Sequence, residues 1–262
     1  MKHPEAVGEL HVSADDKTLR KQSDQKFWQR YFNFYDTLNE AIPYRQMIER
    51  HAALLDPHPG ELILDAGTGT GNVAKALLAY GPRVIGIDFC EPALEICRRK
   101  APAADFRFGD LTQRLDFDAE HFDKVACCCV LHVLSREGQE SAVRELFRVV
   151  KRDGAVAVTA FASGFSPLKV YAETVREQRK TASLLGAFGF VLRYSLNTLR
   201  IIYYVSRIKR REQSGEYNFF TPESLTRMMQ DAGFVVGGVE KGFADQCVTV
   251  VATKPAAPAG RV

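Results

Sequence analysis

The feature that most constrains the fold is the stretch of residues 62–71, which reads LILDAGTGTG. An apolar run ends at an acidic residue and enters a glycine-rich turn, the pattern of a buried strand followed by a loop. Glycines let the backbone turn tightly and let a ligand approach the main chain, because no Cβ stands in the way. A helix predicted from Asn72 to about Tyr80 would point unpaired N–H groups and a positive dipole end at that ligand. The stretch indicates a nucleotide-type pocket, with a plain structural turn as the alternative.

Strand and helix patterns alternate along the chain from this stretch onward. We expect strands at residues 62–65, 83–88, 105–109, 124–130 and 154–161. Helices are expected at residues 72–80, 92–100 and 141–150. The pattern resumes at Thr221, an N-cap, with a helix to about residue 232 and two last strands at 235–241 and 247–254. Strands joined by helices imply right-handed crossovers and a parallel sheet, and apolar strands fit a sheet covered on both faces.

The length of 262 residues suits one α/β domain with additions. A helical, aromatic segment precedes the first strand, and Pro43 is expected to separate two helices because it cannot continue the hydrogen bonding of the first. The expected divisions are a flexible N-terminal arm (1–25), one domain (26–254) with a helical cap (26–56) and a lid insertion (163–217), and a disordered tail (255–262).

Composition excludes several classes of protein. The net charge of +3 is too small to argue for nucleic-acid binding from the total alone. No apolar run is long enough to span a membrane, and the N-terminus lacks a signal-peptide core, so we expect a cytoplasmic protein. The six cysteines form no CxxC pair, and we expect neither a metal site nor a disulfide framework. Cysteines 127–129 lie in a predicted buried strand, where they are interpreted as small core hydrophobes rather than nucleophiles.

The glycine spacing and two downstream acids distinguish between nucleotides. A dinucleotide fingerprint requires G-x-G-x-x-G, whereas Gly67, Gly69 and Gly71 are spaced G-x-G-x-G and Asn72 stands where the last glycine should be. Asp88 ends the second strand, where a carboxylate can accept both hydroxyls of a ribose. Asp110 follows the third strand and is placed to meet an adenine amino group. An NAD site, the rival interpretation, needs the missing glycine and has no use for Asp110.

Together, the DAGTGTG run at 65–71, Asp88 and the Gly109-Asp110 pair resemble the class I S-adenosylmethionine-dependent methyltransferases, from about residue 40 to the end. The resemblance implies a Rossmann-like α/β fold with a mostly parallel seven-stranded sheet, helices on both faces and a reversed hairpin strand at the end. It implies S-adenosylmethionine as cofactor and S-adenosylhomocysteine as product. The cofactor contacts it implies are Tyr35, Asp65, Ala66, Gly67, Thr68, Gly69, Gly71, Asp88, Phe89, Gly109, Asp110, Leu111 and Cys129.

The aromatic segment 31–36 resembles the aromatic-Tyr-Asp segment of the ubiquinone/menaquinone and phospholipid N-methyltransferase group. The resemblance implies a helix lying over the cofactor, with Tyr35 as the contact. The alternative is that these aromatics only pack the helix on the sheet.

A catalytic residue is expected at the end of the fourth strand, because ligands bind at the carboxyl ends of parallel strands. Methyl transfer mainly requires alignment and exclusion of water, and a base is needed only if the acceptor must lose a proton. His132 is the candidate base, with no direct catalytic role as the alternative. The strand end lacks the signature of DNA amino-methyltransferases, so we expect no nucleic-acid acceptor.

The insertion 163–217 carries ten Lys or Arg against four Glu. Arg193, Arg200 and Arg207 recur every seven residues, which would place them on one face of a helix. Such a basic amphipathic helix suits an anionic membrane surface, and a lid packed on its own domain is the alternative. The sequence therefore predicts methyl transfer to a small amphipathic or apolar acceptor, a lipid or quinone-like molecule. A soluble secondary metabolite as acceptor, or a non-catalytic cofactor-binding subunit, are the alternatives.

Overall fold

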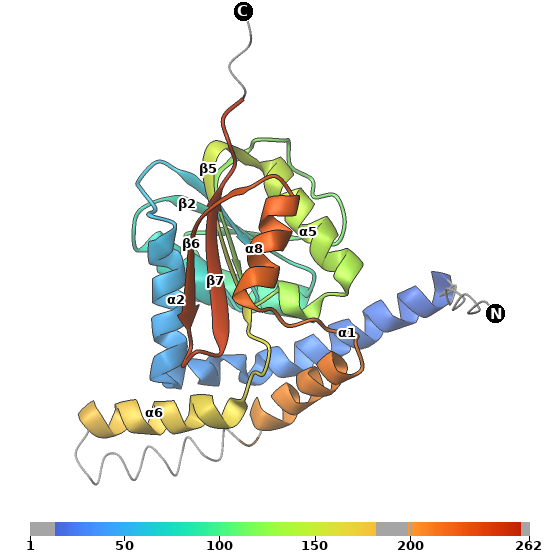
Figure 1. Cartoon of the computed structure of the whole chain (residues 1–262), viewed down its shortest axis with the longest axis vertical. Helices are drawn as coiled ribbons and strands as arrows, with labels where there is room; N and C mark the ends of the chain where they lie inside the picture. Colours follow the sequence, from blue (N-terminus) through green and yellow to red (C-terminus); the bar gives the residue numbers. More distant parts are fainter. Residues whose placement is uncertain (1–13, 182–198, 200, 258–262) are drawn as a thin grey trace, which may run out of the picture.

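The computed structural model describes residues 14–181, 199 and 201–257 (Figure 1). Its centre is a seven-stranded sheet with the strand order β3-β2-β1-β4-β5-β7-β6. The strands are β1 (Leu62–Ala66), β2 (Arg83–Asp88), β3 (Asp105–Phe108), β4 (Phe122–Cys128), β5 (Val150–Phe161), β6 (Val235–Gly242) and β7 (Cys247–Thr253). The first five strands are parallel, and β7 runs antiparallel to both of its neighbours, β5 and β6. The predicted fold class, including the reversed last strand, is confirmed.

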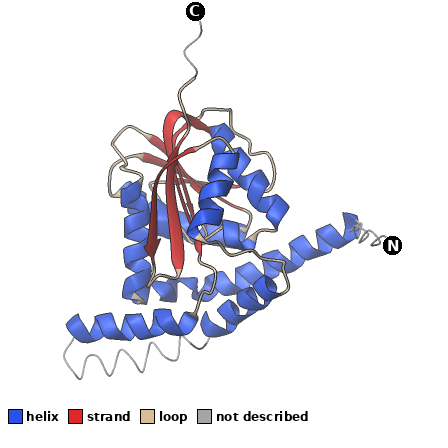
Figure 2. Ribbon diagram, viewed as in Figure 1, coloured by secondary structure: helices blue, strands red, loops and turns tan. Residues whose placement is uncertain are grey.

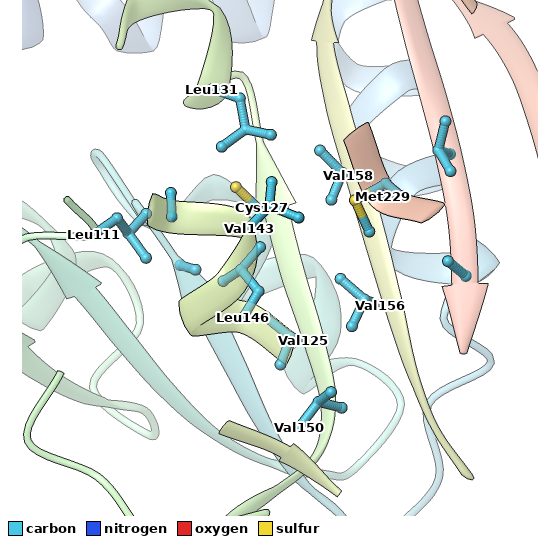
Figure 3. Packing of buried hydrophobic residues seen from close by; sticks show 14 of the residues in the cluster. Leu111, Val125, Cys127, Leu131, Val143, Leu146, Val150, Val156, Val158 and Met229 are labelled. Carbon is cyan, nitrogen blue, oxygen red and sulfur yellow. The ribbon is translucent and has the colours of Figure 1, made fainter. Parts of the chain in front are cut away.

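Helices cover both faces of the sheet (Figure 2). They are α3 (Asn72–Leu78), α4 (Glu91–Lys100), α5 (Arg136–Val149) and α8 (Pro222–Asp231). One face packs against α5 and α8 in a core of aliphatic side chains from β1, β4 and β5, part of which Figure 3 shows. The apolar strands predicted from the sequence are therefore buried on both sides, and the strand order reverses between β1 and β4, where α/β folds bind ligands.

Two boundaries within the sheet domain differ from the prediction by four or five residues. Helix α5 begins at Arg136 rather than residue 141, because the Ser135 side chain caps it by accepting a hydrogen bond from Gly138 N at 3.2 Å. The first turn of this helix is charged and polar, so the apolar pattern used to predict helices did not extend to its start. Strand β5 begins at Val150, which pairs with Phe122, although the polar residues 151–153 interrupt its apolar run.

A helical cap precedes the sheet and is longer than predicted. Helix α1 spans Ala14–Tyr35, a 3-10 turn spans Asp36–Glu40 and α2 spans Ile42–Leu54. Pro43 lies in the first turn of α2, where its missing N–H costs nothing, so the predicted break between two helices is confirmed. The predicted flexible arm is wrong for residues 14–25, which are helical. Their polar sequence lacks an apolar stripe but contains good helix formers.

The described part of the lid contains α6 (Pro167–Thr181) and a helix over residues 201–213. Together with α1, these helices lie across the carboxyl ends of the parallel strands (Figure 1). Aromatic contacts join the lid to the cap: the Tyr204 ring lies 5.6 Å from that of Phe27 and 5.3 Å from that of Tyr31. Arg193 and Arg200 lie outside the described residues. Within the described part of the chain, no helix is both long and apolar enough to cross a bilayer.

Candidate active site

The glycine loop between β1 and α3 adopts backbone angles that favour glycine. Gly67, Gly69 and Gly71 have φ values of 77°, 55° and 80°, in the left-handed region that costs other residues free energy. The N–H groups of Gly67 and Thr68 donate to the carbonyl of Ile87, at 2.9 and 2.8 Å. These bonds fasten the loop to the end of β2.

Asp65 supports this loop from behind. Its carboxylate accepts hydrogen bonds from Thr68 Oγ1 at 2.6 Å and from Ala74 N at 3.0 Å, and burial raises its pKa to about 7. Asp65, Ala66 and Gly71 do not line the main cavity described below. The predicted contacts of these three residues with the cofactor stay a prediction, and the role that the structure shows for Asp65 is to hold the loop.

Asp88 lies at the end of β2 with only 6% of its surface exposed. Its Oδ2 accepts a hydrogen bond from Gly69 N at 2.9 Å, and its Oδ1 accepts one from Cys90 N at 2.9 Å. Burial raises the pKa of the carboxyl to about 6, and the backbone N–H groups oppose that shift. A carboxylate offers about four acceptor positions, so each oxygen can accept a further hydroxyl proton.

A cavity of about 710 Å³ lies at the carboxyl ends of the strands, and we call it the main cavity. Its volume falls in the range of about 300–1,000 Å³ typical of small-molecule sites. Asp110 lines it, and its Oδ1 accepts hydrogen bonds from Thr112 N and Oγ1 at 3.0 and 2.7 Å. The predicted residues that the structure brings together around this cavity are Tyr35, Gly67, Thr68, Gly69, Asp88, Phe89, Gly109, Asp110, Leu111, Cys129 and His132.

Comparison with known proteins identifies this arrangement. Residues 63–154, which contain the glycine loop, Asp88 and Asp110, match the family model described as a methyltransferase domain. Residues 63–154 therefore carry a methyltransferase domain. The chain is 31% identical over 153 residues to the malonyl-[acyl-carrier protein] O-methyltransferase of Serratia marcescens, covering 58% of each chain. It is 38% identical over 117 residues to the demethylmenaquinone methyltransferase of Clavibacter sepedonicus, covering 43% of this chain and 46% of the relative.

Solved structures agree with the methyltransferase fold. The magnesium protoporphyrin IX methyltransferase of Synechocystis PCC 6803, solved with bound S-adenosylhomocysteine, aligns over 91% of this chain and 100% of its own. The TM-score is 0.58 at 18% sequence identity, which is evidence for the fold alone. The chain spans about half the length of the first curated relatives it matches. The family and the cofactor predicted from the sequence are confirmed.

The main cavity of the methyltransferase domain fits S-adenosylmethionine. A Cβ on Gly67 would lie 2.3 Å from Val130 Cγ2, so a side chain at this position would close the gap between the loop and the end of β4. The two Asp88 oxygens, already fixed by backbone N–H groups, can accept the two ribose hydroxyls. Leu111, 6% exposed, offers an apolar surface for the adenine ring beside Asp110.

Sequence reasoning missed several walls of this cavity. The sequence shows Trp28, Tyr31 and Phe32 as an aromatic cluster, but their spacing does not predict that they line the cavity. Tyr44 and Phe161 come from α2 and β5, and only the fold brings them together. The further lining residues include Ile48, Asn72, Val130, Ser135, Ser141, Arg144, Ile208 and Tyr217.

A polar network attaches the cap to the glycine loop of the methyltransferase domain. The Tyr44 hydroxyl donates to the Tyr35 hydroxyl at 3.0 Å and accepts from Asn72 Nδ2 at 3.2 Å. Asp36 accepts hydrogen bonds from Thr70 Oγ1 at 2.7 Å and from Lys100 Nζ at 2.6 Å. Because Tyr44 donates to it, Tyr35 retains its own O–H proton to donate toward the main cavity. The predicted contact of Tyr35 with the cofactor stays a prediction.

His132 lines the main cavity just after β4, with its imidazole 4.1 Å from the Phe161 ring and nearly parallel to it. Its Nδ1 accepts a hydrogen bond from Phe161 N at 3.4 Å, which places the ring proton on Nε2. Burial lowers its pKa to about 4, so the ring is neutral at pH 7 and only a weak base. The role of His132 as a base stays a prediction.

A side pocket of about 50 Å³ adjoins the main cavity. Five residues line both spaces: Tyr31, Tyr35, Tyr44, Cys129 and Phe161. The far walls come from the lid and from the β6–β7 turn, and consist of apolar and aromatic side chains: Phe165, Pro167, Val170, Tyr171, Ile201, Ile202, Val205 and Phe243. The two spaces are therefore neighbours separated by shared aromatic residues.

Cofactor binding is expected to weaken in acid. The Asp88 carboxyl offers both of its oxygens as acceptors only when it is ionised, and its pKa of about 6 means that it gains a proton below that pH. The affinity for S-adenosylhomocysteine should therefore fall about tenfold for each pH unit below 6, and stay level from pH 7 to 8. Calorimetry across pH 5–8 measures this, and the Asp88→Asn variant, which cannot titrate, should lose the slope. A wild-type affinity that is constant down to pH 5 would contradict this.

Proposed function

We propose that this chain transfers a methyl group from S-adenosylmethionine to an amphipathic acceptor with an apolar tail, a lipid or quinone-like molecule. The observation that carries the proposal is the side pocket. Its walls are mainly apolar and aromatic, it adjoins the main cavity at Cys129 and Phe161, and it leads toward the lid helices. An acceptor whose reactive head lies in the main cavity would place an apolar tail in this pocket.

The residues of the site would align and shield the reaction. When bound, S-adenosylmethionine supplies a methyl group on a sulfonium centre for in-line displacement. Gly67, Gly69 and Asp88 hold the cofactor, and Tyr35 and His132 offer O–H and N–H donors to the acceptor head. The cap and lid exclude water, because both pack over the carboxyl ends of the strands and join through the Tyr204 contacts. Alignment and a dry site are the main requirements of such a transfer.

The names of the relatives support this acceptor class. The Clavibacter relative is named for demethylmenaquinone, a quinone, whereas the Serratia relative is named for malonyl-[acyl-carrier protein]. A charged malonyl group linked to a protein matches the aromatic and aliphatic walls of the side pocket less well. The quinone-like acceptor is therefore the one that the described residues favour.

The acceptor proposal predicts a dependence on tail length. Purified protein is incubated with isotopically labelled S-adenosylmethionine and lipid extract, and products that gain one methyl group are identified by mass spectrometry. Products should carry an apolar tail. Val170→Trp, which fills the side pocket, should lower kcat/KM for a long-tailed acceptor at least tenfold, since each excluded CH₂ costs about 0.8 kcal/mol. A short-tailed analogue should be unaffected.

Val239→Trp, on the exposed side of β6, is the matched control because the same substitution there fills no pocket. Equal loss for long and short acceptors in Val170→Trp would contradict a tail in the side pocket. Cofactor binding without methyl gain in any extract would indicate a non-catalytic binding subunit instead. Methyl gain only on soluble metabolites would make these the acceptors.

We also propose that the lid contacts an anionic membrane surface. Leu199 and Tyr203 are 65% and 56% exposed, and Arg207 and Arg210 are exposed on the following turns. The spacing of four residues places Leu199, Tyr203 and Arg207 on one face. The opposite face of the same helix is buried through Ile201, Val205 and Ile208. An outward face of apolar, aromatic and basic side chains is typical of interfacial helices.

Charge reversal tests the membrane proposal. Each basic residue near an anionic surface contributes about 1 kcal/mol, so Arg207→Glu/Arg210→Glu should reduce binding to phosphatidylglycerol-containing vesicles by about 30-fold or more. Flotation of the protein with the vesicles measures this. Arg83→Glu/Arg152→Glu, at the amino ends of the strands, has the same change in charge and should bind like wild type. Equal loss in both pairs, or no vesicle binding by wild type, would end the proposal.

A further inference from the structure

Three thiols converge on one side of the sheet at the end of β4. Side chains alternate along a strand, and Cys127 and Cys128 follow this rule: they pack in cores on opposite faces. Cys129 breaks it. Its φ of 61° turns the chain, so Cys129 packs on the same side as Cys128 and Cys247. The Sγ atoms of Cys128 and Cys129 are 4.0 Å apart.

Cys129 is the thiol that lies where the two spaces meet. Cys127 and Cys247 are completely buried, whereas Cys128 and Cys129 are both half-buried and line the main cavity. Of these two, Cys129 also lines the side pocket. Its backbone N–H donates to Thr159 O at 2.7 Å, which holds the left-handed conformation. A non-glycine residue in this conformation costs free energy of about 1 kcal/mol or more, and such residues cluster at functional sites.

The surroundings of Cys129 favour a thiolate. Hydrogen bonds from the Cys128 and Cys247 thiols hold the pKa of Cys129 well below its usual range, although burial opposes this. His132 and His51 also face it. Burial lowers the pKa of each histidine to about 4, so at pH 7 the stabilisation comes from thiol donors rather than from imidazolium charge.

His51 is a second buried group near the Cys129 thiol. It is 1% exposed, and its Nδ1 lies 2.8 Å from Thr159 Oγ1. Its Nε2 is buried and has no hydrogen-bond partner among the residues that the structure describes. His51 lines neither the main cavity nor the side pocket, so the site of Cys129 is defined by the residues of those two spaces.

We propose that Cys129 is a nucleophilic thiol that captures planar, electron-poor unsaturated carbonyl compounds, such as quinone rings, as covalent adducts in the main cavity. Three features of the described residues support this class of ligand. The thiol lies where the two spaces meet, the walls there are the rings of Tyr31, Tyr35, Tyr44 and Phe161, and neighbouring thiols can donate hydrogen bonds to the sulfur. The inference goes beyond methyl transfer and does not depend on it.

The chemistry is a conjugate addition and needs no oxidant. The sulfur of Cys129 forms a bond to the ring carbon β to a carbonyl, and the carbon–carbon π electrons move to that carbonyl oxygen. The oxygen takes a proton from water. Loss of the ring proton from the carbon that bears sulfur, and protonation of the second oxygen, then give a hydroquinone thioether. The sum is one thiol plus one quinone, so the protein gains the full mass of the ring compound.

Intact-protein and peptide mass spectrometry with 1,4-naphthoquinone, added to the full chain without cofactor, tests the proposal. We expect a first adduct of the full probe mass on Cys129, formed at least tenfold faster than on a cysteine-containing peptide. Cys129→Ser should abolish this fast phase. Cys128→Ala, which removes a hydrogen-bond donor, should slow it several-fold, and the distant Cys90→Ser is the matched control that should leave it unchanged.

First modification at another cysteine, or a Cys129 rate equal to that of the peptide, would overturn the proposal. If Cys129→Ser does not fold, peptide mapping of the wild-type adduct still decides the site. Adduct formation is measured without S-adenosylmethionine, so its failure is distinct from failure of methyl transfer. Prior loading with S-adenosylhomocysteine and a slow-reacting alkyl-substituted quinone should protect Cys129, because both would fill the space around it.

Discussion

Replacement of Asp88 by alanine is expected to abolish measurable binding of S-adenosylmethionine and S-adenosylhomocysteine. Asp88 is the acid at the end of β2 whose two oxygens are free to accept ribose hydroxyls after fixing Gly69 N and Cys90 N. Each hydrogen bond to a charged group contributes about 1.5–3 kcal/mol. Loss of two such bonds weakens binding by on the order of 10²–10⁴-fold. Isothermal titration calorimetry measures the affinity directly.

Asp88 also holds the glycine loop in place. The controls must therefore distinguish loss of the hydrogen bonds to the ligand from loss of support for the loop. Asp88→Asn keeps one acceptor oxygen and should retain more affinity than Asp88→Ala. Asp105→Ala removes an exposed aspartate at the start of the neighbouring β3 and should bind like wild type. Thermal melting of each variant without cofactor shows whether the fold is intact. Near-normal affinity in a folded Asp88→Ala variant would remove this residue from the site.

The glycine spacing and the strand-end acids predicted the cofactor side of the site because their chemistry is local. The roles predicted for Gly67 and Asp88 depend only on the local backbone conformation and on the strand that ends beside each residue. Parallel strands then bring their carboxyl ends to one edge, so Asp110 joins them without further information. The direction of the Asp65 side chain is different: it turns back to Thr68 and Ala74, and no one-dimensional pattern records that direction.

The acceptor side could not be predicted in the same way, because tertiary contacts form it. Tyr44 reaches the site through its hydrogen bonds to Tyr35 and Asn72, and Phe161 reaches it from the far end of β5. The family resemblance implies Cys129 as a cofactor contact, whereas strand alternation alone predicts that its thiol lies on the face opposite that of Cys128. A single positive φ reverses the side on which its thiol lies, and nothing in the sequence marks that turn.

Substitution of Gly67 by alanine is expected to damage both stability and cofactor binding. Its φ of 77° costs an alanine about 1–2 kcal/mol. The new Cβ would also lie 2.3 Å from Val130 Cγ2, and such overpacking costs about 1–3 kcal/mol. The free energy of unfolding should fall by about 2–5 kcal/mol in total, and the affinity for S-adenosylhomocysteine should fall with it because the clash pushes the loop and the β4 end apart.

Two further variants separate strain from collision. Gly60→Ala has a similar backbone conformation, with φ 89°, but its Cβ would meet nothing within 4 Å. The free energy of unfolding of this variant should fall only by the cost of the backbone conformation, about 1–2 kcal/mol, and its cofactor affinity should equal that of wild type. Gly67→Ala/Val130→Ala removes the colliding methyl groups and should recover affinity while keeping the backbone strain. Urea denaturation and calorimetry measure the two quantities. If the double variant binds the cofactor no better than Gly67→Ala, the contact with Val130 is not the reason that position 67 requires glycine. The backbone conformation alone would then be the reason.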